Sequence, residues 1–193
     1  MLPALIVFAY LIGSISAAIL VCKLMGLPDP RTQGSNNPGA TNVLRIGGKK
    51  AAAIVLLGDG LKGLIPVAIG QSLGLGIGEL TWVALAAFLG HVYPLFFGFK
   101  GGKGVATFIG ALLVLHFYTG LAFVATWLFV AKVLKISSLS ALIATLLTPL
   151  YFYLLTSEAQ ASYVLILMGL WIFWTHRSNI KRMVSGEEDT IKS

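Results

Sequence analysis

The chain has 193 residues, of which 57% are hydrophobic and 11% are charged. A soluble domain carries roughly 25% charged residues, so this composition excludes a soluble globular protein, and its hydrophobicity excludes a disordered one. The single cysteine, Cys22, excludes an internal disulfide and a cysteine-based metal cluster. The formal net charge of +7 favours a membrane protein with basic loops and an anionic ligand over a nucleic-acid-binding protein.

Apolar stretches recur along the whole chain, and a helix that spans a bilayer needs about 20 mostly apolar residues. The pattern predicts an all-α integral membrane protein with about seven transmembrane helices in one multi-pass domain, 1–193. The expected spans are residues 2–25, 51–70, 80–97, 105–117, 121–131, 139–155 and 161–174. The fourth and fifth are short and separated only by residues 118–120, so they could instead form one re-entrant pair.

Basic residues predict the orientation of these spans. The two longer loops on one side, 72–78 and 156–160, contain no lysine or arginine, whereas the loops on the other side are rich in both. Cytoplasmic loops carry the excess of basic residues, so we expect the N-terminus outside and the C-terminus in the cytoplasm. Merging the fourth and fifth spans would place Lys132 and Lys135 outside, which argues for seven.

Residues 34–45, GSNNPGATNVLR, form the first of three polar segments that this topology places at the cytoplasmic face. Asn37 and Pro38 predict the start of a short helix, as N-cap and first helical residue. The free N–H groups at such an end favour an anion. Asn42 and Arg45, three residues apart, would share a face of this helix.

The second segment, 90–107, contains Lys100-Gly-Gly-Lys103-Gly104 ahead of an apolar helix. Glycines let the backbone approach an anion closely, and the helix N-terminus favours it. The spacing does not match the P-loop of nucleotide-binding proteins, which needs four residues between its first glycine and the Gly-Lys pair. The segment therefore predicts a phosphate-binding loop without a nucleotide fold.

In the third segment, 176–188, His176, Asn179 and Arg182 follow one another at one-turn spacing on an expected helix. A basic interfacial anchor beside Trp171 and Trp174 is an equally good interpretation of this segment taken alone.

Two charges, Asp59 and Lys62, lie within the second span, where charges are costly and usually paired. Their spacing predicts a salt bridge that is structural or supports Lys103 or Arg45. His91, near the end of the third span, either touches the site or packs. The sequence contains no zinc-binding motif and no nucleophile elbow, and we expect no metal and no other cofactor.

Together the segments GSNNPGATNVLR, GHVYPLFFGFKGGKGVAT and HRSNIKRMVSGEE, with GDGLKG at 58–63 and SLS at 138–140, resemble the PlsY family of bacterial membrane acyltransferases. The resemblance covers essentially the whole chain. It implies transfer of an acyl group from an acyl phosphate to the 1-hydroxyl of sn-glycerol 3-phosphate, giving lysophosphatidic acid and phosphate. It also implies a multi-pass protein of the bacterial inner membrane that acts within the lipid bilayer, does not use acyl-CoA, and is expected to be a monomer.

Residue types and the resemblance together predict the site. Lys103, His176 and Asn179 are the expected catalytic residues. We expect the phosphates to be bound by Ser35, Asn42, Arg45, Gly101, Gly102, Lys103, Gly104 and Ser138. The residues expected to support them are Asn36, Asn37, Thr41, Asp59, Lys62, His91, Thr107, Arg177, Arg182 and Glu187.

Two alternatives remain open at this stage. The three segments could form the vestibule of a transporter or channel for an organic phosphate, although no repeat relates the two halves of the chain and the polar segments gather at one face. The general base is also open. The His-x4-Asp pair of soluble-type glycerolipid acyltransferases is absent, so either the substrate's own phosphate or His176 must accept the proton.

Overall fold

The computed structural model describes residues 1–191, and every regular element within them is helical. The predicted all-α class is confirmed. The helices are α1 (Leu2–Gly13), α2 (Ala17–Leu24), α3 (Ala40–Ser72), α4 (Ile77–Val92), a short 3-10 turn (Leu95–Phe97), α5 (Val105–Leu115), α6 (Phe117–Leu134), α7 (Ser137–Thr156), α8 (Ala159–Thr175) and α9 (Arg177–Val184).

The first predicted span is two helices rather than one. The helix is interrupted at residues 14–16. The hydroxyl of Ser16 caps α2 by accepting a hydrogen bond from the amide of Ile19 at 3.4 Å. The break frees the carbonyl of Ile15, which accepts a hydrogen bond from Nζ of Lys62 at 2.9 Å. A lysine buried in α3 therefore ties the first span to the second.

Helix α3 is interrupted at Gly48, whose φ of 75° lies in the left-handed region that glycine tolerates. The part before the interruption is the short helix predicted in the first polar segment. It begins at Ala40 with Gly39 as N-cap, so the predicted start at Asn37 and Pro38 is wrong by two residues. The amide of Gly39 bonds to the carbonyl of Asn37 at 2.9 Å, which keeps these residues in a turn ahead of the helix.

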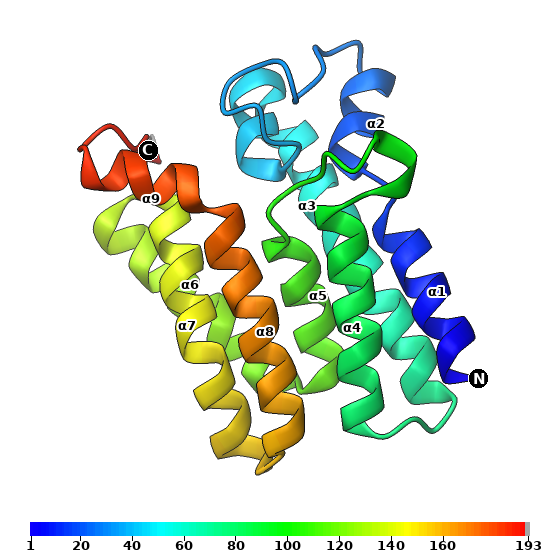
Figure 1. Ribbon diagram of the computed structural model, residues 1–193. Coiled ribbons are helices and arrows are strands. Elements are labelled where there is room, and N and C mark those ends of the chain that lie inside the picture. Colours follow the sequence, from blue (N-terminus) through cyan, green and yellow to red (C-terminus); the bar gives the residue numbers. More distant parts are fainter. Residues whose placement is uncertain (192–193) are drawn as a thin grey trace.

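Helix α5 is short. Its 11 residues rise about 16 Å, roughly half the thickness of a bilayer core. The chain turns at His116, whose Nδ1 accepts a hydrogen bond from the amide of Thr119 at 3.3 Å and caps α6. The loop that precedes α5 descends into the bundle to reach its first turn (Figure 1).

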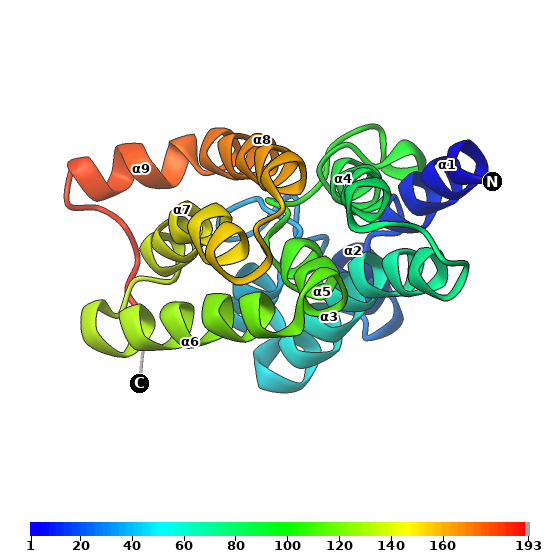
Figure 2. The same ribbon diagram turned by 90° about the horizontal axis from the view of Figure 1, so that it is seen from below.

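The helices form two groups. In the first group α1 packs on α4 and α3 crosses α5, while in the second α6 and α8 both pack on α7 (Figure 2). Contacts of α5 with α6 and of α4 with α8 join the groups. The core, which includes Phe88, Phe108 and Met168, runs through both groups along α4, α5 and α8.

Five helical stretches are long and apolar enough to cross a membrane, and α5 and α8 are apolar but shorter. The chain is an integral membrane protein with several apolar helices. The three polar segments lie at one end of the bundle, opposite the N-terminus (Figure 1). The orientation of that end toward the cytoplasm stays a prediction.

Candidate active site

A cavity of about 500 Å³ opens between the two groups of helices. One end of it is polar and is formed by the three segments. The other end is apolar and lies between α3, α5 and α6. The apolar residues at this end include Leu56, Leu57, Leu61, Leu64, Ile109, Leu113, Val124, Trp127 and Leu128. One cavity can therefore hold an anionic group and a hydrocarbon chain together.

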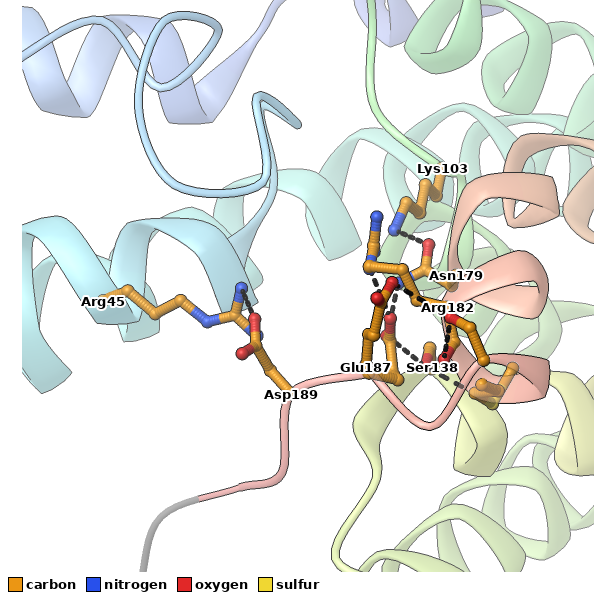
Figure 3. Close-up of polar contacts among 10 residues, drawn as sticks. Arg45, Lys103, Ser138, Asn179, Arg182, Glu187 and Asp189 are labelled. Carbon is orange, nitrogen blue, oxygen red and sulfur yellow. Dashed lines mark hydrogen bonds and ion pairs between the residues drawn. The ribbon is translucent and has the colours of Figure 1, made fainter.

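Lys103 and Asn179 meet at the polar end. The Lys103 ammonium donates a hydrogen bond to Oδ1 of Asn179, and its backbone carbonyl accepts one from the hydroxyl of Thr175 at 3.1 Å (Figure 3). Burial lowers the pKa of Lys103 to about 8, although the Glu188 carboxylate opposes the shift. The lysine is still charged at neutral pH, and α8 and α9 hold it toward the cavity.

Arg45 approaches the same cavity from the short first part of α3. Its Nη1 lies 3.0 Å from a carboxylate oxygen of Asp189, in the tail that follows α9 (Figure 3). Both side chains are partly exposed, so the pair contributes little to stability. The planar guanidinium is thus available to a better ligand, such as a phosphate.

His176 is buried at the junction of α8 and α9 and lines the cavity. Its Nδ1 lies 2.8 Å from the carbonyl of Ile172. A carbonyl can only accept, so Nδ1 carries the proton and Nε2 is the free acceptor. Burial, with the nearby Lys103 cation, lowers the pKa of His176 to about 4. The ring is neutral at pH 7 and can accept a hydrogen bond from a hydroxyl group.

Glu188 provides a carboxylate at the polar end of the cavity, and its side chain is only 7% exposed. It accepts hydrogen bonds from Ser138 at 2.7 Å, from Asn179 at 2.5 Å and from Nε of Arg182 at 2.7 Å. These bonds hold the pKa of Glu188 below its usual value even though burial opposes the shift. Glu187, which the sequence predicted as a supporting residue, is exposed and accepts a hydrogen bond from the hydroxyl of Ser185.

The first polar segment is organised by Asn42. Its Oδ1 accepts from the amide of Ser35 at 2.9 Å, and its Nδ2 donates to the carbonyls of Pro30 and Gln33. Asn42 lines the cavity, but these bonds use both N–H donors of its amide, so it holds the loop in place instead of donating to a phosphate as predicted. Ser35, Asn37 and Thr41 line the cavity beside Arg45.

The glycine-rich loop divides into two parts. Lys103 and Gly104 line the cavity together with the first turn of α5. Gly104 has a φ of 93°, and a side chain there would strike the ring of Phe88. Gly101 and Gly102 lie behind the cavity wall, and the amide of Gly102 donates to the carbonyl of His91 at 3.2 Å. The predicted direct phosphate contacts of Gly101 and Gly102 are therefore replaced by packing.

The predicted salt bridge within the second span is present. Nζ of Lys62 lies 2.9 Å from Oδ1 of Asp59, and both residues are buried. The salt bridge does not contact Lys103 or Arg45, which were the predicted partners. Lys62 instead contacts Ile15, and Asp59 contacts His91. Asp59 and His91 line the cavity.

Besides Lys62 and Glu187, three other predicted supporting residues do not line the cavity. Asn36 is exposed in a turn with a φ of 56°, and Thr107 is buried, donating to the carbonyl of Asp59 at 2.9 Å. Arg177 stacks on Trp174, with its guanidinium carbon 4.7 Å from the ring centroid. This contact is compatible with the interfacial anchor that was the alternative interpretation of the third segment.

Sequence reasoning missed Glu188, Asp189 and the apolar wall of the cavity. The second acidic residue of the GEE stretch was the available signal for Glu188, whereas no local pattern pointed to the other two. Among residues 1–191 no group of three histidine, cysteine or acidic side chains gathers that could hold a metal ion.

The chain is similar to known proteins over nearly its whole length. A family model described as glycerol-3-phosphate acyltransferase matches residues 3–186. The chain is 68% identical over 187 residues to the glycerol-3-phosphate acyltransferase of Ruthia magnifica, covering 97% of this chain and 95% of the relative. It is 50% identical over 188 residues to that of Francisella tularensis subsp. novicida, covering 97% and 92%.

Two crystal structures of PlsY, an integral membrane glycerol 3-phosphate acyltransferase, are similar to the chain. Its glycerol 3-phosphate form superposes with a TM-score of 0.95 at 39% identity, covering 99% of this chain and 96% of the other. Its lysophosphatidic acid form gives a TM-score of 0.91 at 38% identity, covering 98% and 94%.

Proposed function

The chain belongs to the glycerol-3-phosphate acyltransferase family, and on that premise we propose that it moves an acyl group from an acyl phosphate to the 1-hydroxyl of sn-glycerol 3-phosphate. The products are lysophosphatidic acid and inorganic phosphate, in the first acylation of phospholipid synthesis. The predicted family is confirmed. The acyl phosphate donor and the inner membrane of a bacterium as the site of action are parts of the proposal.

The observation that carries the proposal is the composition of the cavity. Its polar end presents Arg45, Lys103 and Arg182, and its apolar end is lined by leucines of α3 with Trp127 and Leu128 of α6. Both proposed substrates carry a phosphate, and one also carries an acyl chain. A cavity that joins a cationic end to a hydrocarbon-lined end at one end of the bundle suits both substrates.

The chemistry follows from the activated donor. The acceptor hydroxyl oxygen attacks the carbonyl carbon of the acyl phosphate and forms an ester bond, while the bond between that carbon and the phosphate oxygen breaks. Inorganic phosphate leaves, and the hydroxyl proton passes to a base. Because the donor is already a mixed anhydride, the protein needs to align the reactants and stabilise negative charge, and no covalent enzyme intermediate is required.

We assign the base to the phosphate of glycerol 3-phosphate. A phosphate monoester has a second pKa near 6, whereas the pKa of His176 is about 4, a poorer match to neutral pH. In this assignment Nε2 of His176 accepts from the non-reacting 2-hydroxyl of the substrate and orients the acceptor, so the proton of the 1-hydroxyl passes to the phosphate. Lys103 and the first turn of α5 receive the oxyanion or the departing phosphate. Arg45 and Ser35 bind the acceptor phosphate, with Asn179 beside them.

The test uses purified protein in detergent or lipid. Incubation with an acyl phosphate and labelled glycerol 3-phosphate should yield labelled lysophosphatidic acid and inorganic phosphate. Acyl-CoA in place of the acyl phosphate should give no product, and excess chelator should leave turnover intact. Turnover with acyl-CoA would overturn the proposed donor. Uptake of label into vesicles without any donor would instead support the transporter hypothesis.

A further inference from the structure

We infer that Asp59 is a positioning residue for the reaction: its carboxylate orients His91, and His91 in turn holds the glycine-rich loop that carries Lys103. This inference rests on the proposed function. It gives a role to a buried cluster of charged residues that do not themselves bind a phosphate. The cluster consists of Asp59 and Lys62 on α3 and His91 at the end of α4.

Asp59 and His91 are in contact within the bundle. Nδ1 of His91 lies 3.6 Å from Oδ1 of Asp59, and both side chains are buried. Within the part of the chain that the structure describes, Nδ1 of His91 has no hydrogen-bond partner. A buried ring nitrogen without a partner is costly. A shift of a few tenths of an ångström would turn this contact into a hydrogen bond.

His91 also contacts the glycine-rich loop. The backbone carbonyl of His91 accepts the amide of Gly102 at 3.2 Å. The ring packs so closely on Gly102 that a side chain there would collide with Nε2 and Cε1 of His91. Lys103 is the next residue and reaches into the cavity. The orientation of the His91 ring therefore sets where the backbone of Gly102 and Lys103 can lie.

Lys62 has a different role from His91 in the cluster. Its ammonium contacts the Asp59 carboxylate at 2.9 Å and donates to the carbonyl of Ile15, in the break between α1 and α2. A salt bridge that served only the packing of the first two spans would need no histidine beside it. Asp59 and His91 also line the cavity, whereas Lys62 points away toward α1. Within the cluster, Lys62 thus balances the charge of Asp59, while Asp59 also positions His91, and the two roles can be tested separately.

Two double variants separate them. Asp59→Leu with Lys62→Met, and Asp59→Asn with Lys62→Met, both remove the two charges together, which avoids leaving one charge buried alone. Leucine and asparagine have the same branched shape as aspartate, but only asparagine keeps an oxygen that can accept the N–H of His91. The two variants therefore have the same charge and a similar size, and the amide of asparagine supplies an oxygen that leucine lacks.

The experiment measures KM for both phosphate substrates, kcat, and thermal unfolding in detergent for the wild type and both double variants. We expect similar unfolding temperatures for the two variants. We expect the leucine variant to have a KM for at least one phosphate substrate about tenfold or more above that of the asparagine variant, with a smaller change in kcat. A tenfold rise in KM is the change expected when the loop is displaced and Lys103 loses its charge-assisted hydrogen bond to a phosphate.

Equal KM and kcat values in the two double variants would overturn the inference, because the acceptor oxygen would then have no role. If neither double variant folds, His91→Phe replaces them. It keeps a ring against Gly102 and leaves the Asp59–Lys62 pair intact, but it lacks the N–H. We expect the same rise in KM, and a wild-type KM would count against Asp59 as a positioning residue. Absence of turnover in the wild type would mark failure of the proposed function instead.

Discussion

Lys103 and Asn179 are 76 residues apart in the chain, yet the lysine ammonium donates a hydrogen bond directly to the asparagine side chain. The contact joins the glycine-rich loop of the first helix group to α9 of the second. The Asn179 amide also donates to Glu188 at 2.5 Å, so one asparagine connects the lysine to a carboxylate. The polar end of the cavity is therefore assembled from both groups of helices, and substitutions on either side should affect it.

Arg45→Ala and Lys103→Ala should each reduce kcat/KM by at least about ten- to hundredfold, because a hydrogen bond to a charged group contributes about 1.5–3 kcal/mol. Steady-state kinetics of the purified variants would measure this. Lys50→Ala is the matched control, since Lys50 is an exposed cation on the same helix. Near-normal turnover in either site variant would contradict the phosphate-binding assignment.

The pKa of Lys103, lowered to about 8 by burial, predicts an alkaline limit on activity. The ammonium is charged below this pH and loses its proton as pH rises through it, so kcat/KM should fall above about pH 8. The profile of kcat/KM reports the free enzyme, which is the state that the pKa describes. Lys103→Arg keeps its charge at all accessible pH values and should remove this limb from whatever activity it retains. An unchanged limb in that variant would assign the titration to another group.

His176→Gln separates the two candidate bases. If the substrate phosphate is the base, glutamine should retain part of the rate with a similar pH profile, because its amide can still hydrogen-bond to the hydroxyl. General base catalysis by His176 would contribute about 10²–10⁴-fold. Loss of turnover on that scale, with acceptor affinity largely intact and the pH-dependent limb gone, would make His176 the base.

Asp189→Asn should lower the KM for the phosphate substrate that Arg45 binds. Asp189 contacts the Arg45 guanidinium at 3.0 Å and competes with a phosphate for it. A partly exposed pair is worth about 0.2–1 kcal/mol, so the decrease should be at most about fivefold. Glu187→Gln is the control, because it removes the same charge two residues away without touching Arg45. A higher KM in Asp189→Asn alone would show that Asp189 orients Arg45 instead.

Reporter fusions test the orientation in the membrane. A reporter after the last residue should be cytoplasmic, and one inserted at Gly76, between α3 and α4, should face outside. The prediction rests on the absence of basic residues from 72–78 and 156–160. The opposite result at either position would move the polar end of the cavity to the outer face.

The sequence alone determined the class of the protein, its family and three polar segments whose residues line one cavity. Composition and hydropathy act locally, so spans and polar segments can be recognised without knowing how helices pack. Arg45, Lys103, His176 and Asn179 were all expected at the site, and all four line one cavity. Polar side chains at the ends of apolar helices are excluded from the hydrocarbon core, so segments on the same side of the membrane gather at one face.

Only the tertiary structure decided which atoms of those segments face the cavity. Asn42 and Gly102 bond to other parts of the chain, because Asn42 closes its own loop and Gly102 meets the end of α4. Neighbouring residues point in different directions, so Glu188 and not Glu187 enters the site. Asp59 meets His91 because α3 packs against α4, a contact that no local spacing encodes.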